Sequence, residues 1–120
     1  MTRILAVDDS PSMRDMVRIT LTGAGFEVTQ AADGQQALDL ARKSEFDLVL
    51  SDVNMPVMDG IELIRALRAE SSYRHTPILM LTTEGSADRK REGKEAGATG
   101  WIVKPFDPAQ LVATMHRVLR

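Results

Sequence analysis

The chain has 120 residues, of which 43% are hydrophobic and 27% are charged, and its formal net charge is -2. A chain of this length buries roughly two thirds of the surface that its unfolded form exposes, so we expect one globular domain over residues 1–120. The weak negative charge argues against nucleic acid or a membrane surface as a partner. The absence of cysteine excludes disulfides and thiolate metal sites. The first apolar run, residues 4–7, is too short for a signal peptide or membrane span, which favours a cytoplasmic location.

Short apolar and β-branched runs alternate along the chain with segments of helical pattern. The predicted strands cover residues 3–7, 26–31, 47–51, 78–82 and 101–103. The first, third and fourth runs are almost continuously apolar, as expected of strands that are buried on both faces. The alternation is typical of βαβ units and predicts a doubly wound, five-stranded parallel sheet flanked by five helices.

Most of the predicted helices begin at a recognisable capping residue. The four clear starts are Ser10 before Pro11, Asp33 before Gly34, Asp59 before Gly60 and Asp107 before Pro108. The first and last helices each have an apolar face. These faces consist of Met13, Met16, Val17, Thr20 and Ala24 in the first, and of Leu111, Val112, Met115, Val118 and Leu119 in the last.

The fourth helix, residues 86–96, has an unusual composition. Ala87 and Ala96 are its only apolar residues, four basic residues lie between them, and Gly93 in its interior costs about 1 kcal/mol relative to alanine. We expect it to be the least stable element. It is either an ordinary solvated surface helix or a helix that shifts when the protein acts.

Chemically reactive side chains follow the predicted strands. Asp8 and Asp9 follow the first strand, Asp52 the third, Thr82 ends the fourth and Lys104 follows the fifth. The carboxyl ends of parallel strands share one edge of a sheet, and ligands bind there. Three converging carboxylates repel one another unless a cation is present, and oxygen ligands favour Mg²⁺. A hydroxyl and an ammonium beside that ion suit a phosphoryl group.

Other proteins of this fold class fit the sequence less well. A flavodoxin needs an acid-free phosphate loop after the first strand, where Asp8 and Asp9 stand. Nucleotide-binding glycine motifs are absent between a strand and a helix. An aspartate-based phosphatase normally needs a second acid two residues after the nucleophile, and Asn54 occupies that position.

Four segments together resemble the receiver domain of two-component response regulators. They are VDDSPSMR, LSDVNMPVMDGIEL, LTTEG and WIVKPF, and the resemblance covers the whole chain in the order typical of the family. It implies the flavodoxin-like, CheY-like fold, with strand order 2-1-3-4-5. The segment pattern is most similar to that of single-domain chemotaxis regulators.

The resemblance also assigns roles to individual residues. Asp52 would be the phosphoacceptor, and Mg²⁺ would be held by Asp8, Asp9, Asp52 and the backbone carbonyl of Asn54, with Asp9 the more direct ligand. Lys104 would pair with the phosphoryl oxygens and Thr82 would move toward them. The remaining assignments are Trp101 as the coupled switch aromatic, Asn54 and Glu84 as residues that tune dephosphorylation, and Pro105 as a cis-proline. Trp101 replaces the usual tyrosine or phenylalanine, so an ordinary half-buried strand aromatic remains the alternative.

These roles describe a signalling protein, which catalyses only its own phosphotransfer and slow dephosphorylation and is not an enzyme in the usual sense. The expected partners are a sensor histidine kinase or phosphotransfer protein, a target such as a flagellar motor switch component, and a phosphatase. We expect a monomer. We also expect no output domain after the last helix, so the signal would leave by binding another protein. The alternatives are a phosphorelay carrier, a phosphate sink, or a receiver cut from a larger regulator.

Overall fold

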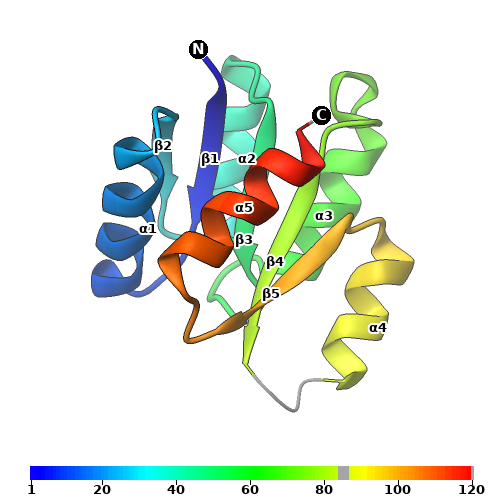
Figure 1. Cartoon of the computed structure of the whole chain (residues 1–120). Coiled ribbons are helices and arrows are strands. Elements are labelled where there is room, and N and C mark those ends of the chain that lie inside the picture. Colours follow the sequence, from blue (N-terminus) through cyan, green and yellow to red (C-terminus); the bar gives the residue numbers. More distant parts are fainter. Residues whose placement is uncertain (84–86, 120) are drawn as a thin grey trace.

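The computed structural model describes residues 1–83 and 87–119, which form alternating strands and helices (Figure 1). The strands are β1 (Arg3–Val7), β2 (Glu27–Ala31), β3 (Leu48–Asp52), β4 (Ile78–Thr83) and β5 (Gly100–Lys104). The helices are α1 (Pro11–Gly23), α2 (Gly34–Lys43), α3 (Gly60–Ala69), α4 (Ala87–Ala96) and α5 (Pro108–Val118), with a short 3₁₀ turn, η1, at Ser71–Tyr73.

The five strands form one parallel sheet in the order β2-β1-β3-β4-β5. Helices pack on both faces of this sheet, with α1 and α5 on one face and α2, α3 and α4 on the other (Figure 1). The predicted fold class and the strand order implied by the resemblance are therefore confirmed. The chain reverses its direction of winding between β1 and β3, which is where ligands bind in sheets of this kind.

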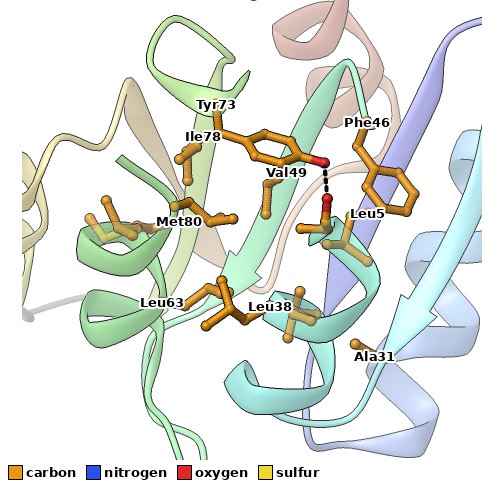
Figure 2. Close-up of a cluster of buried hydrophobic side chains, with 14 of the residues drawn as sticks. Leu5, Ala31, Leu38, Phe46, Val49, Leu63, Tyr73, Ile78 and Met80 are labelled. Atoms are coloured by element: carbon orange, nitrogen blue, oxygen red, sulfur yellow. Dashed lines mark hydrogen bonds between the residues drawn. The ribbon is translucent and has the colours of Figure 1, made fainter. Parts of the chain in front are cut away.

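Two apolar clusters fill the space between the sheet and its helices. Alternate residues of β1 point to opposite faces, so Leu5 and Val7 enter one cluster while Ile4 and Ala6 enter the other. Figure 2 shows the cluster beneath α2 and α3, where the hydroxyl of Tyr73 donates a hydrogen bond to a backbone carbonyl. The carbonyl oxygens of Ala41 and Ser44 both lie 2.7 Å from this hydroxyl and share its single proton. A buried tyrosine is stable there because its polar atom is satisfied.

Several element boundaries differ slightly from the predicted ones. Strand β3 begins at Leu48, one residue later than predicted. Asp47 still contacts β1, because its amide donates to the Arg3 carbonyl and its carboxylate accepts from the Arg3 amide, both at 2.7 Å. Strand β3 ends at Asp52, which pairs with Leu81 in the ladder to β4. Strand β5 includes Lys104, which pairs with Thr83. Asp52 and Lys104 are therefore the last residues of their strands and do not follow them.

The apolar face of α1 is rotated relative to the predicted one. Val17 and Leu21 are its buried residues, whereas Met16 is 48% exposed. The prediction missed Leu21, which lies one helical turn beyond Val17 and contacts the cluster that includes Phe26. The apolar face of α5 is confirmed, with Leu111 and Met115 fully buried.

Helix α4 is as poor in apolar contacts as its composition predicts, and Ser86 lies outside the described residues. Gly93 is nevertheless buried, and a Cβ atom at this position would overlap the sulfur and terminal methyl of Met80 in β4. The glycine thus lets α4 approach the sheet closely and is not only a weak point of the helix. Among the described residues, no helix is both long and apolar enough to span a bilayer.

Candidate functional site

Three carboxylates meet at the edge of the sheet where β1 and β3 end. Val7 is in register with Ser51, so the residues that follow them, Asp8 and Asp52, lie side by side. One oxygen from each of Asp8, Asp9 and Asp52 falls within a group whose atoms all lie within 4.8 Å of one another. Asp8 is 2% and Asp52 9% exposed, while Asp9 is exposed to solvent. The structure thus brings the predicted acidic residues together.

The local backbone orients Asp8. Its Oδ1 accepts a hydrogen bond from the Ser10 amide at 2.9 Å, and its carbonyl accepts one from Nη1 of Arg14 at 2.6 Å. Ser10 is the N-cap of α1, so the start of that helix determines where the carboxylate lies. The sequence reasoning did not identify Arg14, although a basic residue in the first turns after an acidic pair was a visible signal.

Lys104 bridges the two buried carboxylates. Its Nζ lies 3.1 Å from Oδ2 of Asp8 and 3.1 Å from Oδ1 of Asp52. Burial by itself would lower the pKa of Lys104, but the hydrogen bond and charge of Asp52, together with those of Asp8, outweigh it and raise the pKa. The ammonium is therefore protonated at neutral pH. One positive charge among three carboxylates leaves a net negative site.

Asp52 has two differently placed oxygens. Oδ1 accepts from its neighbouring amide, that of Val53, at 2.8 Å and also faces Lys104. Within the described residues, all hydrogen bonds and ion pairs of this carboxylate are made by Oδ1, so Oδ2 is available for chemistry. Burial, followed by the negative charge of Asp8, raises the pKa of Asp52 above its ordinary value. Gly60 packs against the backbone of Asp52 so closely that a Cβ would overlap its carbonyl oxygen.

Thr82 and Trp101 differ sharply in exposure. Thr82 is 3% exposed, and its hydroxyl is a buried polar atom without a hydrogen-bond partner among the described residues. Trp101, on the edge strand β5, is 43% exposed, and Nζ of Lys90 lies 5.5 Å from its ring centroid. Trp101 therefore has the exposure of a half-buried strand aromatic, and its role as a switch stays a prediction. A buried hydroxyl without a hydrogen bond destabilises the fold, so a new acceptor near Thr82 would be favourable.

The other predicted site residues are less informative. Asn54 is exposed in the connection between β3 and α3, and Glu84 lies outside the described residues. The peptide bond between Lys104 and Pro105 is cis.

The donor set suits a hard divalent cation. The clustered ligands are carboxylate oxygens, and their surplus negative charge needs compensation. Mg²⁺ prefers such ligands and retains water molecules, which the exposed position of Asp9 permits.

Comparison with known proteins identifies the family. The model of the response regulator receiver domain matches residues 4–116. The chain belongs to this family. It is 42% identical to the chemotaxis protein CheY-3 of Vibrio cholerae over 117 residues, which cover 97% of this chain and 90% of that protein. The receiver's function is two-component response regulation, and it is not a classical enzyme.

Solved structures of other receivers are closely similar. Vibrio cholerae CheY4 is 58% identical, covers 98% of both chains and superposes with a TM-score of 0.94. The receiver domain of the Pseudomonas aeruginosa sensor histidine kinase PA1611 is 32% identical, covers 98% of this chain and 97% of its own, and has a TM-score of 0.92. That structure is described with a magnesium ion coordinated in the active site cleft.

Proposed function

We propose that the chain accepts a phosphoryl group on Asp52 from a phosphohistidine of a sensor kinase or phosphotransfer protein. An oxygen of Asp52 attacks phosphorus, the phosphorus–nitrogen bond breaks, and the imidazole leaves with its electron pair, which gives a mixed acyl phosphate. The observation that carries this proposal is the buried carboxylate pair of Asp8 and Asp52 bridged by Lys104. A bound Mg²⁺ would neutralise the charge that accumulates on the transferred oxygens.

The neighbouring residues have distinct proposed roles. Asp8, Asp9, Asp52 and the carbonyl of Asn54 hold Mg²⁺. Once Asp52 is modified, Lys104 pairs with a phosphoryl oxygen, which is a stronger acceptor than the carboxylate it replaces. The buried hydroxyl of Thr82, which has no hydrogen-bond partner in the described part of the chain, then gains an acceptor. The side chains of Asn54 and Glu84 regulate access of water and so set the lifetime of the phosphoryl group.

We propose that the signal leaves through the surface formed by α4, β5 and α5. Thr82 lies on the strand next to β5, and Trp101 is exposed on β5 itself. The similarity to chemotaxis regulators over nearly the full chain supports chemotaxis, with a flagellar motor switch component as the target. A phosphorelay carrier or phosphate sink differs only in its partner, a phosphotransfer domain, and a receiver belonging to a larger regulator would act on its own output domain.

The direct test is phosphoryl labelling of Asp52. Wild-type protein incubated with Mg²⁺ and acetyl phosphate should gain the mass of one phosphoryl group, and Asp52→Asn should gain none. Full phosphoryl incorporation in Asp52→Asn would show that the phosphoacceptor is another residue. Capture experiments with beryllium fluoride bound at the site then separate the outputs, because a motor switch protein and a phosphotransfer domain are different partners.

A further inference from the structure

Helix α4 makes few apolar contacts with the rest of the molecule. Gly93 approaches Met80 closely, and Ala96 packs against the cluster beneath α2 and α3. At its first turns, Arg89 and Lys90 extend in two directions, Arg89 toward α3 and Lys90 toward the ring of Trp101 on β5. Two neighbouring residues thus link this helix to both of its flanks.

The contact on the α3 side is an ion pair between distant parts of the sequence. Nη2 of Arg89 lies 3.3 Å from Oδ2 of Asp59, and its Nη1 lies 3.1 Å from Oε2 of Glu92. The side chains of Arg89 and Asp59 are only 29% and 28% exposed, so water screens this pair less than the surface pairs of the same helix. The Nε of Arg89 is buried without a hydrogen-bond partner within the described residues, so the guanidinium is incompletely satisfied.

Asp59 lies at the end of the segment that connects Asp52 to α3. Its Oδ1 caps α3 by accepting from the Glu62 amide at 2.9 Å, which leaves Oδ2 for Arg89. The next residue, Gly60, donates to the carbonyl of Val53 at 2.8 Å and packs against the backbone of Asp52. A displacement of Asp59 therefore reaches the phosphoacceptor backbone through a single intervening residue.

The connection itself is under strain. Val57 has φ of 69°, a conformation that β-branched residues rarely adopt. The amide of Met58 donates to the carbonyl of Pro56 at 2.7 Å, which closes a tight three-residue turn around Val57. Such a turn persists only where its surroundings hold it. The amide of Gly34 donates to the carbonyl of Met58 at 3.0 Å, and Asp59, the N-cap of α3, directly follows the turn.

We propose that Arg89 is a positioning residue for the phosphoacceptor loop, residues 53–59, and that the Arg89–Asp59 pair couples this loop to α4. The coupling acts in addition to that through Thr82, and the inference rests on the proposed function. The pair is formed in the arrangement in which the Thr82 hydroxyl has no hydrogen-bond partner among the described residues. In this proposal the pair is weakened when Thr82 contacts the phosphoryl group, so the pair favours the arrangement seen here.

The test uses two single variants and their combination. Arg89→Met keeps the apolar stem and removes the charge, and Asp59→Asn removes the charge while asparagine still caps α3. The probe is beryllium fluoride with Mg²⁺, titrated while Trp101 emission is recorded. Each variant should bind the mimic about 2- to 5-fold more tightly, as expected for an ion pair of this exposure, and the double variant should bind no more tightly than either.

Arg91→Met is the matched control, because Arg91 pairs with Asp88 on the same helix at 67% and 80% exposure. Amide exchange over residues 88–96 without the mimic should accelerate in Arg89→Met and Asp59→Asn, and not in the control. A purely structural role would not tighten binding of the mimic. Unchanged or weaker binding of the mimic in both Arg89→Met and Asp59→Asn, or additive effects in the double variant, would overturn this inference. The proposed phosphorylation of Asp52 would still stand. If wild-type protein does not bind the mimic at all, the proposed function fails and the inference fails with it.

Discussion

At the scale of single residues, the site holds carboxylates close together, and their repulsion lowers the stability of the fold. Asp8 and Asp52 are almost completely buried, and among the described residues Lys104 is the cation that pairs with both of them. Their repulsion is what a divalent cation relieves, so cation binding and folding stability are linked through the same residues.

Asp9→Ala should weaken Mg²⁺ binding by about tenfold or more. At 4 Å, one unit charge contributes about 1 kcal/mol in water and about 4 kcal/mol at an effective dielectric of 20, and 1.4 kcal/mol is a factor of ten in affinity. Titration followed by calorimetry or by Trp101 emission measures the change. Asp15→Ala, an exposed aspartate of α1 outside the cluster, is the control. If Asp9→Ala binds Mg²⁺ with the same affinity as wild type, Asp9 is not a metal ligand.

Asp52→Asn should raise the thermal unfolding midpoint in metal-free buffer near neutral pH. Burial and Asp8 raise the pKa of Asp52, so the folded chain binds this proton more tightly than the unfolded chain does. The stability that protonated Asp52 confers is complete below the ordinary pKa and is lost as pH rises through the raised pKa. Above the raised pKa, the charged carboxylate destabilises the folded state relative to an uncharged side chain. At this size 1 kcal/mol corresponds to roughly 3–6 °C. Added Mg²⁺ should narrow the difference, and an equal or lower midpoint for the variant in metal-free buffer would contradict this account.

At the scale of elements, the local sequence pattern predicted most of the architecture. The strands, the capping residues and the acids at the strand ends are all local signals, and the capping aspartates of α2, α3 and α5 each accept the expected amide hydrogen bond. The prediction of buried residues failed where apolar residues occur on more than one face of a helix. In α1, Met16 and Leu21 are equally apolar, and only the packed structure distinguishes the exposed residue from the buried one.

Contacts between side chains far apart in sequence were not predictable. Nε of Arg68 donates to the carbonyl of Gly97 at 3.0 Å, and its Nη1 donates to the carbonyls of Tyr73 and Thr76 at 2.6 and 2.7 Å. The pair of Arg89 and Asp59 similarly joins α4 to the start of α3. Nothing in a local pattern distinguishes these arginines from solvated ones, because their partners are positioned by the tertiary fold.

Gly93→Ala tests how α4 is packed. An exposed helical glycine gains about 1 kcal/mol on replacement by alanine, whereas overpacking a core costs about 1–3 kcal/mol. Because the new methyl group would overlap Met80, we expect a net destabilisation of up to about 2 kcal/mol in chemical denaturation. In a Met80→Ala background the same substitution should be neutral or stabilising. Lys94→Ala, at the neighbouring exposed position, is the control. A more stable Gly93→Ala protein in the wild-type background would show that α4 does not need this close approach.

At the scale of the whole molecule, the proposed coupling links a charged site at one edge of the sheet to the α4–β5–α5 surface. We propose two connections from the site. One runs from Asp52 through Thr82 in the neighbouring strand toward β5, and the other runs through the phosphoacceptor loop and Asp59 to Arg89. Both end near Trp101, against which Lys90 of α4 packs. A coupling of 1–3 kcal/mol between site and surface gives about 5- to 150-fold tighter partner binding, which is sufficient for a signal.

Because Trp101 is the sole tryptophan, its emission measures this coupling directly. In wild-type protein, adding Mg²⁺ and beryllium fluoride together should change the emission in a saturable manner, while either added alone should produce a smaller effect. Asp52→Asn should abolish the response, because the mimic has lost its attachment point. Thr82→Ala should bind the mimic with the Trp101 response lost or strongly reduced. Unchanged Trp101 emission in wild-type protein that is shown by calorimetry to bind the mimic would contradict the proposed transmission from Asp52 to the α4–β5–α5 surface.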